Sequence, residues 1–168
     1  MDTTQAGTED FQPSREEMCA LWALVKEERL DELTGMKRFY ADIIRDHGAM
    51  FAKEVDGVEH PESHEYQPGQ GVNPYLHILL HGLVGAQVVR KDPLEIVAFT
   101  NAMKKQGLDA HTIQHLLCAV FFPLILEGKS QGGEPDMKKY SRLLKKYKTK
   151  TPEKIHADLN REFVQTVS

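Results

Sequence analysis

The chain has 168 residues, 40% of them hydrophobic and 27% charged, and its formal net charge is −4 at pH 7. This composition is typical of a soluble globular domain, and the negative charge argues against a general nucleic-acid-binding protein. The longest apolar run, from Cys118 to Leu126, contains a proline and is far shorter than the roughly 20 residues of a membrane-spanning helix. We therefore expect neither a membrane nor a nucleic acid as partner.

The N-terminal residues 1–13 are polar and acidic, which predicts a disordered lead without a secretory signal. The two cysteines, Cys19 and Cys118, are too few for a disulfide framework, and both fall in apolar helical stretches. Free thiols are typical of reducing compartments, so we expect a cytoplasmic protein.

Hydrophobic residues recur at helical spacing throughout, which predicts an all-α fold, a helical bundle of about six to seven helices. Ser14 and Glu17 form a capping-box pattern at the start of the first helix. A second helix is expected over about 36–55, followed by a long loop over 56–72 that is rich in Gly, Pro, Glu and His. Loops of this length inside compact domains are often functional.

The remaining helices begin after residues that commonly cap helices. We expect these helices over about 74–90, 93–107, 110–127, 135–147 and from 152 onward, with caps at Asn73, Asp92, Asp109 and Thr151. A kink is expected at Pro123. We assign residues 14–150 to the bundle domain and 151–168 to a C-terminal helix.

The helices predicted over 74–90 and 110–127 are apolar on nearly all sides. A helix without a polar face belongs in the middle of a domain. We therefore expect two central, buried helices that pack against each other, with their histidines buried or half-buried.

These two helices carry the most informative pattern in the chain, the pairs His77/His81 and His111/His115. Residues four apart lie one turn apart on the same helix face. Two such helices side by side would bring four imidazoles together, the donor set of zinc, iron, copper and nickel sites. His47, on an apolar helical stripe, is a further ligand candidate.

The pattern predicts a transition metal ion, with zinc or iron as the first candidates and nickel or copper after them. Gln87 and Gln114 lie about one turn from the pairs and could accept the second ring N–H of a ligating histidine. Cys118 could offer a thiolate, although a buried cysteine is usually a small hydrophobic residue. An open coordination position would suit hydrolysis or O2 chemistry, whereas a filled site would be structural or sensory, so enzymatic activity stays open.

A third pair, His60/His64, lies in the predicted loop beside Glu62 and Glu65. No helix fixes its spacing, so a solvated polar turn and a lid or extra ligand group both stay open. No phosphate-binding loop, His-Glu-x-x-His motif or Cys-x-x-Cys motif is present.

The competing interpretation is a metal-free interaction or scaffold protein whose buried histidines are structural. Its support is the segment Lys138–Lys150, which holds seven Lys or Arg residues and no Asp or Glu. This segment suits either a solvated helix face or a surface for RNA or an acidic partner. The amphipathic C-terminal helix could also pair two copies of the chain as a homo-oligomer.

The order of these motifs resembles an uncharacterised bacterial family, domain of unknown function 1841. The resemblance rests on Asn73-Pro-Tyr-Leu-His-Ile-Leu-Leu-His81, Gln87, Asp109-Ala-His-Thr-Ile-Gln-His115 and Pro135-Asp136…Tyr140, and spans roughly 36–147. It implies a helical fold with histidine ligands. His47 is similar to the first histidine of a His-Pro-Glu-Tyr-His segment in that family, and another register places that segment at His60–His64.

The chain also departs from the family. The resemblance implies acidic residues near the motif histidines, at positions where this chain has Ala86, Ala119 and Pro123. Without these carboxylates, a histidine-rich mononuclear site is expected rather than a ferritin-like di-iron centre. The family has no known activity, so the resemblance implies none.

Overall fold

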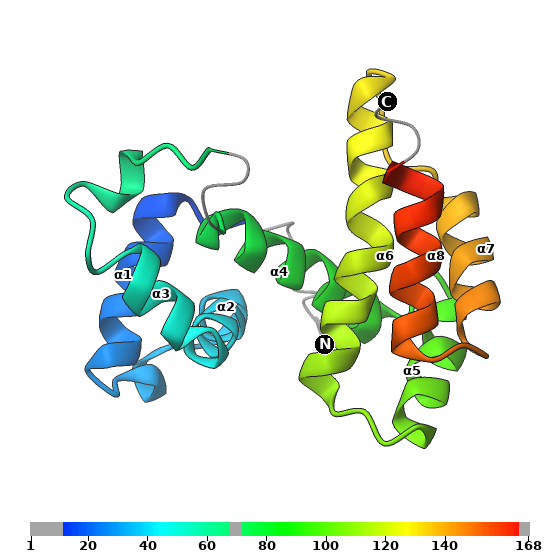
Figure 1. Cartoon of the computed structure of the whole chain (residues 1–168). Helices are drawn as coiled ribbons and strands as arrows, with labels where there is room; N and C mark the ends of the chain where they lie inside the picture. Colours follow the sequence, from blue (N-terminus) through cyan, green and yellow to red (C-terminus); the bar gives the residue numbers. More distant parts are fainter. Residues whose placement is uncertain (1–11, 68–71, 165–168) are drawn as a thin grey trace, which may run out of the picture. The chain divides into compact units, whose positions relative to one another are not determined.

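The computed structural model describes residues 12–67 and 72–164 of the chain, with no side-chain description for residue 164, and this part is all-α (Figure 1). The predicted fold class is confirmed. The predicted N-terminal lead lies almost wholly outside the described residues. The chain divides into two compact units, residues 1–82 and 83–168. The assignment of residues 14–150 to a bundle domain and of 151–168 to a separate C-terminal part stays a prediction.

The first unit contains α1 (Arg15–Lys26), η1 (Leu30–Glu32), α2 (Gly35–Asp46), α3 (Gly48–Glu54) and η2 (Pro61–Ser63), and α4 (Pro74–Arg90) begins in it. The second unit contains the end of α4 with α5 (Glu95–Lys105), α6 (Ala110–Ser130), α7 (Met137–Tyr147) and α8 (Pro152–Val164).

Helix α1 begins as its sequence predicts. The Ser14 Oγ accepts a hydrogen bond from the Glu17 backbone N–H at 3.1 Å, and the Ser14 N–H donates to the Glu17 carboxylate at 2.7 Å. This reciprocal pair satisfies two backbone donors at the helix start, a contribution of about 1 kcal/mol. It fixes the position at which α1 starts to bury Met18, Leu21 and Trp22.

The single helix predicted over 36–55 is wrong, because the structure has two helices that meet at His47. His47 ends α2 with φ −110° and ψ 24° and also starts α3. Its N–H donates to the carbonyls of both Ile43 and Ile44, a shared hydrogen bond typical of a helix end. Gly48, the next residue, weakens helix continuation at this point.

The core of the first unit lies between α1, α2, α3 and the start of α4. The ring of Trp22 packs on that of Phe51 with centroids 5.6 Å apart, and Phe51 packs on Tyr75 of α4 at 6.3 Å. Its buried members are Met18, Leu21, Trp22, Tyr40, Ala41, Ile43, Ile44, Phe51, Val55, Tyr75 and Ile78.

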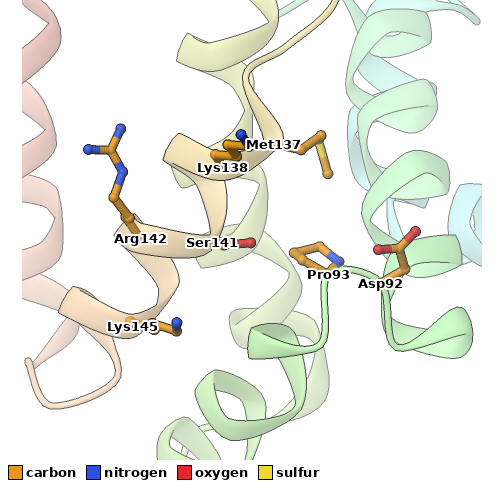
Figure 2. Close-up of a pocket in the computed structure, with 7 residues that line it drawn as sticks. All are labelled: Asp92, Pro93, Met137, Lys138, Ser141, Arg142 and Lys145. Carbon is orange, nitrogen blue, oxygen red and sulfur yellow. The ribbon is translucent and has the colours of Figure 1, made fainter.

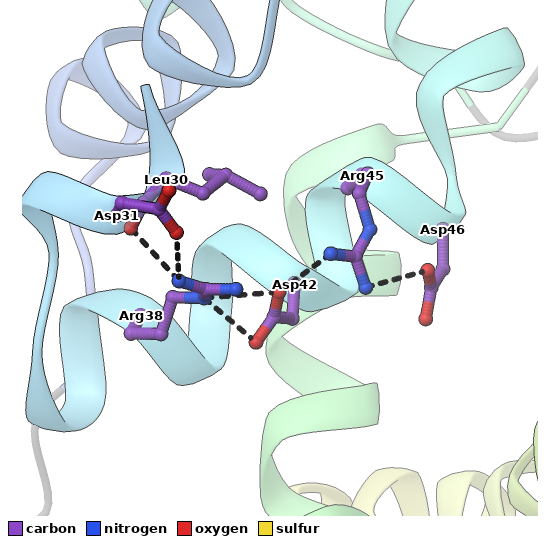
Figure 3. Close-up of polar contacts among 6 residues, drawn as sticks. All are labelled: Leu30, Asp31, Arg38, Asp42, Arg45 and Asp46. Carbon is purple, nitrogen blue, oxygen red and sulfur yellow. Dashed lines mark hydrogen bonds and ion pairs between the residues drawn. The ribbon is translucent and has the colours of Figure 1, made fainter. Parts of the chain in front are cut away.

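The exposed face of α2 carries a short series of ion pairs (Figure 3). The Arg38 guanidinium pairs with Asp42 at 3.1 Å and donates to the Leu30 carbonyl at 2.9 Å, which ties η1 to α2. Asp42 also pairs with Arg45 at 2.9 Å. Such exposed pairs contribute less than about 1 kcal/mol each, so they orient α2 more than they stabilise it.

The segment predicted as a long loop is attached to the unit through main-chain groups. The Tyr75 hydroxyl donates to the Pro61 carbonyl at 2.9 Å, and Arg15 donates to the His64 carbonyl at 2.8 Å. The Tyr66 hydroxyl donates to the Glu54 carbonyl, also at 2.9 Å. The described part of this segment is therefore ordered by three side chains and contains the short helix η2.

In the second unit α6 lies beside both α7 and α8, and α5 packs against α6 and α7 (Figure 1). Asp109 caps α6 as predicted, accepting from the Thr112 N–H at 2.7 Å. The helix continues through Pro123 to Ser130, three residues beyond its expected end. Buried residues of α6 include Ile113, Leu116, Leu117, Val120, Phe121 and Leu124.

The predicted Asp92 cap is wrong. Leu94 occupies the N-cap position of α5, and its side chain makes no capping hydrogen bond. Asp92 and Pro93 instead form part of the connection between α4 and α5, joined by a cis peptide bond. Helix α7 has the side-chain cap that α5 lacks, because Asp136 accepts from the N–H groups of Lys138 and Lys139 at 3.0 Å.

By length and composition, α6 is the one described helix that could cross a membrane. Its most apolar window has a mean hydropathy of 1.4, and 39% of that window is buried inside the fold. Helix α6 also packs against α5, α7 and α8, as a core helix of the second unit does. The predicted packing of α4 on α6 stays a prediction.

Candidate metal centre

Three imidazoles come together in the first unit. The ring centroid of His47 lies 4.7 Å from that of His77 and 4.4 Å from that of His81, and the latter two lie 4.7 Å apart. One possible ligand nitrogen from each ring lies within 4.8 Å of the others. His47 and His81 are 8% and 1% exposed, and His77 is partly buried. The group is thus compact and largely shielded from water.

Local structure places two of these rings. Asn73 caps α4 by accepting from the N–H groups of Tyr75 and Leu76 at 3.1 and 3.2 Å. The cap sets where α4 starts, and His77 and His81 then follow one turn apart on one face. His47 comes from the break between α2 and α3, where the chain leaves the α2 axis.

The backbone fixes the tautomer of His47. Its Nδ1 lies 2.7 Å from the Ile43 carbonyl oxygen, which can only accept, so Nδ1 carries the proton and donates. The Nε2 atom of the neutral ring is therefore the nitrogen with a lone pair, and it is buried. A carbonyl behind the non-ligating ring nitrogen is a usual arrangement for a metal-binding histidine.

A close approach between two helices supports this geometry. A Cβ atom at Gly82 would lie 2.4 Å from the Tyr40 hydroxyl oxygen, well inside van der Waals contact. Gly82 follows His81 directly, and Tyr40 lies two turns before His47 on α2. The missing side chain at Gly82 therefore allows α2 to lie close enough to α4 for the three rings to meet.

Among the described residues, the donors gathered at this point are imidazoles, and no carboxylate or thiol belongs to the group. Cys118 lies in α6 of the second unit, where burial raises the pKa of its thiol to about 12. It stays a protonated thiol at neutral pH, which suits a small hydrophobic core residue better than a ligand.

The second predicted pair lies at the start of α6 in the second unit. The Nε2 atoms of His111 and His115 are 2.9 Å apart, so one ring donates and the other accepts. The expectation that this pair is buried is wrong, because both residues are exposed. The reason is that Ile113, Leu116 and Leu117 form the buried side of these first turns of α6, and the two histidines lie outside it.

The predicted supporting groups differ from expectation. Gln87 accepts a hydrogen bond from the buried Tyr140 hydroxyl at 2.9 Å, which gives it a structural partner in α7. Gln114 is partly buried, and its predicted supporting role stays a prediction. The pair His60/His64 is exposed, and the ring of His64 packs on that of Tyr66 with centroids 4.7 Å apart.

Sequence reasoning missed Tyr40, Gly82 and the Ile43 carbonyl. A glycine inside a strongly apolar helix is a signal of close packing, so Gly82 could have been noticed. The Ile43 carbonyl became available because the helix ends at His47, and Gly48, which follows it, was a local signal of that end.

Neither the curated proteins nor the solved structures contain a match to this chain. A family model does match it, over residues 10–146, which includes both histidine pairs and His47. The chain therefore belongs to the family described as "Domain of unknown function (DUF1841)".

Proposed function

We propose that this protein binds a transition metal ion through His47, His77 and His81. The observation that carries the proposal is the mutual approach of three shielded imidazoles, with ring centroids 4.4 to 4.7 Å apart. Burying three imidazoles in an apolar core is costly unless their nitrogen atoms find partners, and a cation offers one partner to all three.

The distances support this chemistry. Zinc bound by histidine nitrogens at 2.0–2.1 Å in a tetrahedron places those nitrogens about 3.3 Å apart. The three nitrogens lie within 4.8 Å of one another, so movements of about 1 Å would close the site around an ion. Side-chain rotation supplies movements of this size without a change in the helices.

Zinc and iron are the first candidates, with nickel and copper next, because imidazole is a good ligand for all four. The absence of carboxylates among the described donors favours one ion over a carboxylate-bridged pair. We also propose a cytoplasmic location, supported by Cys19 and Cys118, which are free thiols.

We extend the proposal to His111 and His115, on the basis of their i,i+4 spacing and the hydrogen bond between their Nε2 atoms. A neutral ring that donates there can offer Nε2 to an ion once its proton moves to Nδ1, so metal binding by this pair breaks the hydrogen bond without a net release of protons. Three histidines at a tetrahedral ion leave one coordination position open for chemistry.

The test is metal analysis of the full chain purified without an affinity tag, followed by calorimetric titration with Zn²⁺. We expect about one equivalent per chain, lost in His47→Gln and in His81→Gln. His156→Ala, an exposed histidine of α8, is the matched control and should keep the metal. Uptake below about a tenth of an equivalent in the parent, with no heat of binding, would overturn the proposal.

The pair in the second unit is tested separately with His111→Ala plus His115→Ala. If this pair contributes ligands, the affinity for Zn²⁺ falls while His47, His77 and His81 still hold an ion. Unchanged affinity and stoichiometry in this variant would remove the pair from the site. Unfolding of every variant in EDTA, compared with the parent in EDTA, separates lost ligands from lost folding.

A further inference from the structure

Helix α7 carries a cluster of cations that lies far in the sequence from the candidate metal centre of the first unit. Residues 83–168 hold fourteen Lys and Arg against nine Asp and Glu, although the whole chain is negative. Half of these cations fall in Lys138–Lys150. A basic helix of this kind is usually a face exposed to solvent. A binding role therefore requires two further observations, a groove on the surface and cations that no carboxylate neutralises.

The shape is an open groove of about 430 Å³ between α7 and the connection from α4 to α5. Figure 2 shows Asp92 and Pro93 on that connection and five residues of α7 along the groove. The α7 residues are Met137, Lys138, Ser141, Arg142 and Lys145.

The charge in this groove is only partly neutralised. Lys145 pairs with Glu95 at 3.4 Å, and outside the groove Lys139 pairs with Glu127 at 3.1 Å. Lys138 and Arg142 are exposed, and neither belongs to an ion pair among those found in the described residues. These two cations lie four positions apart on α7 and therefore share one face.

An apolar surface accompanies the two cations. Met137 is 40% exposed, and Leu94, which follows Pro93, is 73% exposed. Both are large apolar side chains, and removing them from water against a partner would favour binding. Exposed apolar side chains next to a polar rim are a feature of protein-binding surfaces.

We propose that this groove binds an acidic peptide segment of a partner protein, one that carries an aliphatic side chain between its carboxylates. The carboxylates would pair with Lys138 and Arg142, and the aliphatic side chain would cover Met137 and Pro93, which line the same groove. A nucleic acid is the less suitable partner, because the large exposed apolar side chains of the described residues are aliphatic and offer no stacking surface.

The probe is a short fluorescein-labelled peptide of Asp and Glu residues with two leucines, titrated with the full chain at low and physiological salt. We expect saturable binding that weakens about tenfold or more in Lys138→Glu plus Arg142→Glu. The matched control, Lys129→Glu plus Lys154→Glu, makes the same change in net charge at exposed sites outside the groove and should bind normally. Asp92→Asn should bind about threefold more tightly, because it removes the repelling carboxylate.

Two comparison ligands make the proposal falsifiable. A peptide with serine in place of both leucines should bind more weakly than the leucine peptide. Equal affinity of the two peptides would show that the groove is a non-specific cationic surface. A single-stranded RNA of equal charge that binds more tightly than the peptide would overturn the choice of partner. If the double charge reversal fails to fold by circular dichroism, Lys138→Gln and Arg142→Gln singly must each weaken peptide binding.

Discussion

Gly82 permits the close packing of α2 on α4. It is one of two glycines in α4, and the aromatic ring of Tyr40 occupies the space that a Cβ at this position would need. Tyr40 is 2% exposed and its ring packs edge-on against Phe39, so it has little freedom to move away. The contact sets how closely α2 approaches α4.

Gly82→Ala should therefore destabilise the protein. Alanine favours a helix by about 1 kcal/mol over glycine, but overpacking in a well-packed core costs about 1–3 kcal/mol. We expect a net loss of stability in urea unfolding together with weaker Zn²⁺ binding. Gly133→Ala is the control, since a Cβ there meets nothing within 4 Å. Unfolding curves for Gly82→Ala and Gly133→Ala that coincide would show that α2 can shift without cost.

Cys118 gives a second prediction. Because burial raises the pKa of its thiol to about 12, almost no thiolate is present at pH 8, and the side chain is shielded. In Cys19→Ala, where Cys118 is the remaining thiol, alkylation of the native protein should be slow and should become fast in urea. Rapid native labelling, read by mass spectrometry, would contradict the buried position of this residue.

At the residue scale the sequence predicted those helix caps that depend only on neighbouring residues. Ser14, Asn73 and Asp109 each bond to backbone N–H groups within three residues, so their roles depend on little beyond their neighbours. Asp92 has the same local pattern but does not cap α5, because the connection from α4 to α5 places Leu94 at the N-cap position. The exposure of His111 and His115 likewise depends on how other helices cover α6, and spacing along one helix cannot supply that.

At the scale of elements, one hydrogen bond ties the end of α4 to α7. Tyr140 is fully buried and its hydroxyl donates to Gln87 at 2.9 Å. Burial raises the pKa of this hydroxyl above its ordinary range, which keeps it protonated and able to donate. The bond therefore links two elements that are far apart in sequence.

Tyr140→Phe should lower the free energy of unfolding by about 1–2 kcal/mol, because the partly buried Gln87 oxygen loses its donor. A double-mutant cycle with Gln87→Leu should show a coupling energy of about 0.5 kcal/mol or more. Additive effects in this cycle would mean that the two side chains do not interact in solution.

The break between α2 and α3 was the element that the apolar pattern alone did not predict. Phe39, Tyr40, Ile43 and Ile44 form an apolar stripe at helical spacing, and Phe51 continues the stripe after the break. The pattern therefore fits a continuous helix as well as two shorter ones. What decides is the packing of α3 and the turn at His47, whose energy comes from contacts with α1 and α4.

At the scale of the whole molecule, stability should depend on pH through Asp56. This carboxylate accepts from Lys26 at 2.9 Å and from the Trp22 indole N–H at 2.8 Å. The Lys26 hydrogen bond chiefly, with Trp22 adding to it, holds the pKa of Asp56 below its ordinary value of 3.8. A lowered pKa in the folded state means that the stabilisation is complete above 3.8 and is lost as the pH falls through the lower, folded-state value.

Asp56→Asn should thus be less stable than the parent at pH 7, by about 1 kcal/mol or less because the Lys26 side is exposed to solvent. The difference should shrink as the pH falls below 3.8. Urea unfolding over a pH series measures it, with exposed Glu59→Gln as control. A difference that stays constant down to the acid transition would show that Asp56 does not titrate with folding.

Metal binding should also appear in the stability of the whole chain. An ion that binds the folded state alone, at a free concentration of 100 times its Kd, stabilises by about 2.7 kcal/mol. For a chain of this size that raises Tm by several degrees, about 2–4 °C for each kcal/mol. EDTA should reverse the rise, and His81→Gln should abolish it. An unchanged Tm at saturating Zn²⁺ would contradict a site formed only in the folded state.

The attachment of residues 61–64 to the first unit has a consequence for engineering. Tyr75 and Arg15 bind the carbonyl oxygens of Pro61 and His64, and every amino acid carries such an oxygen. The anchors therefore do not select the side chain at position 64, which is exposed. A cysteine placed there could carry a fluorescent dye or spin label at a defined backbone position, and a library varied at this residue should retain most of its folded members.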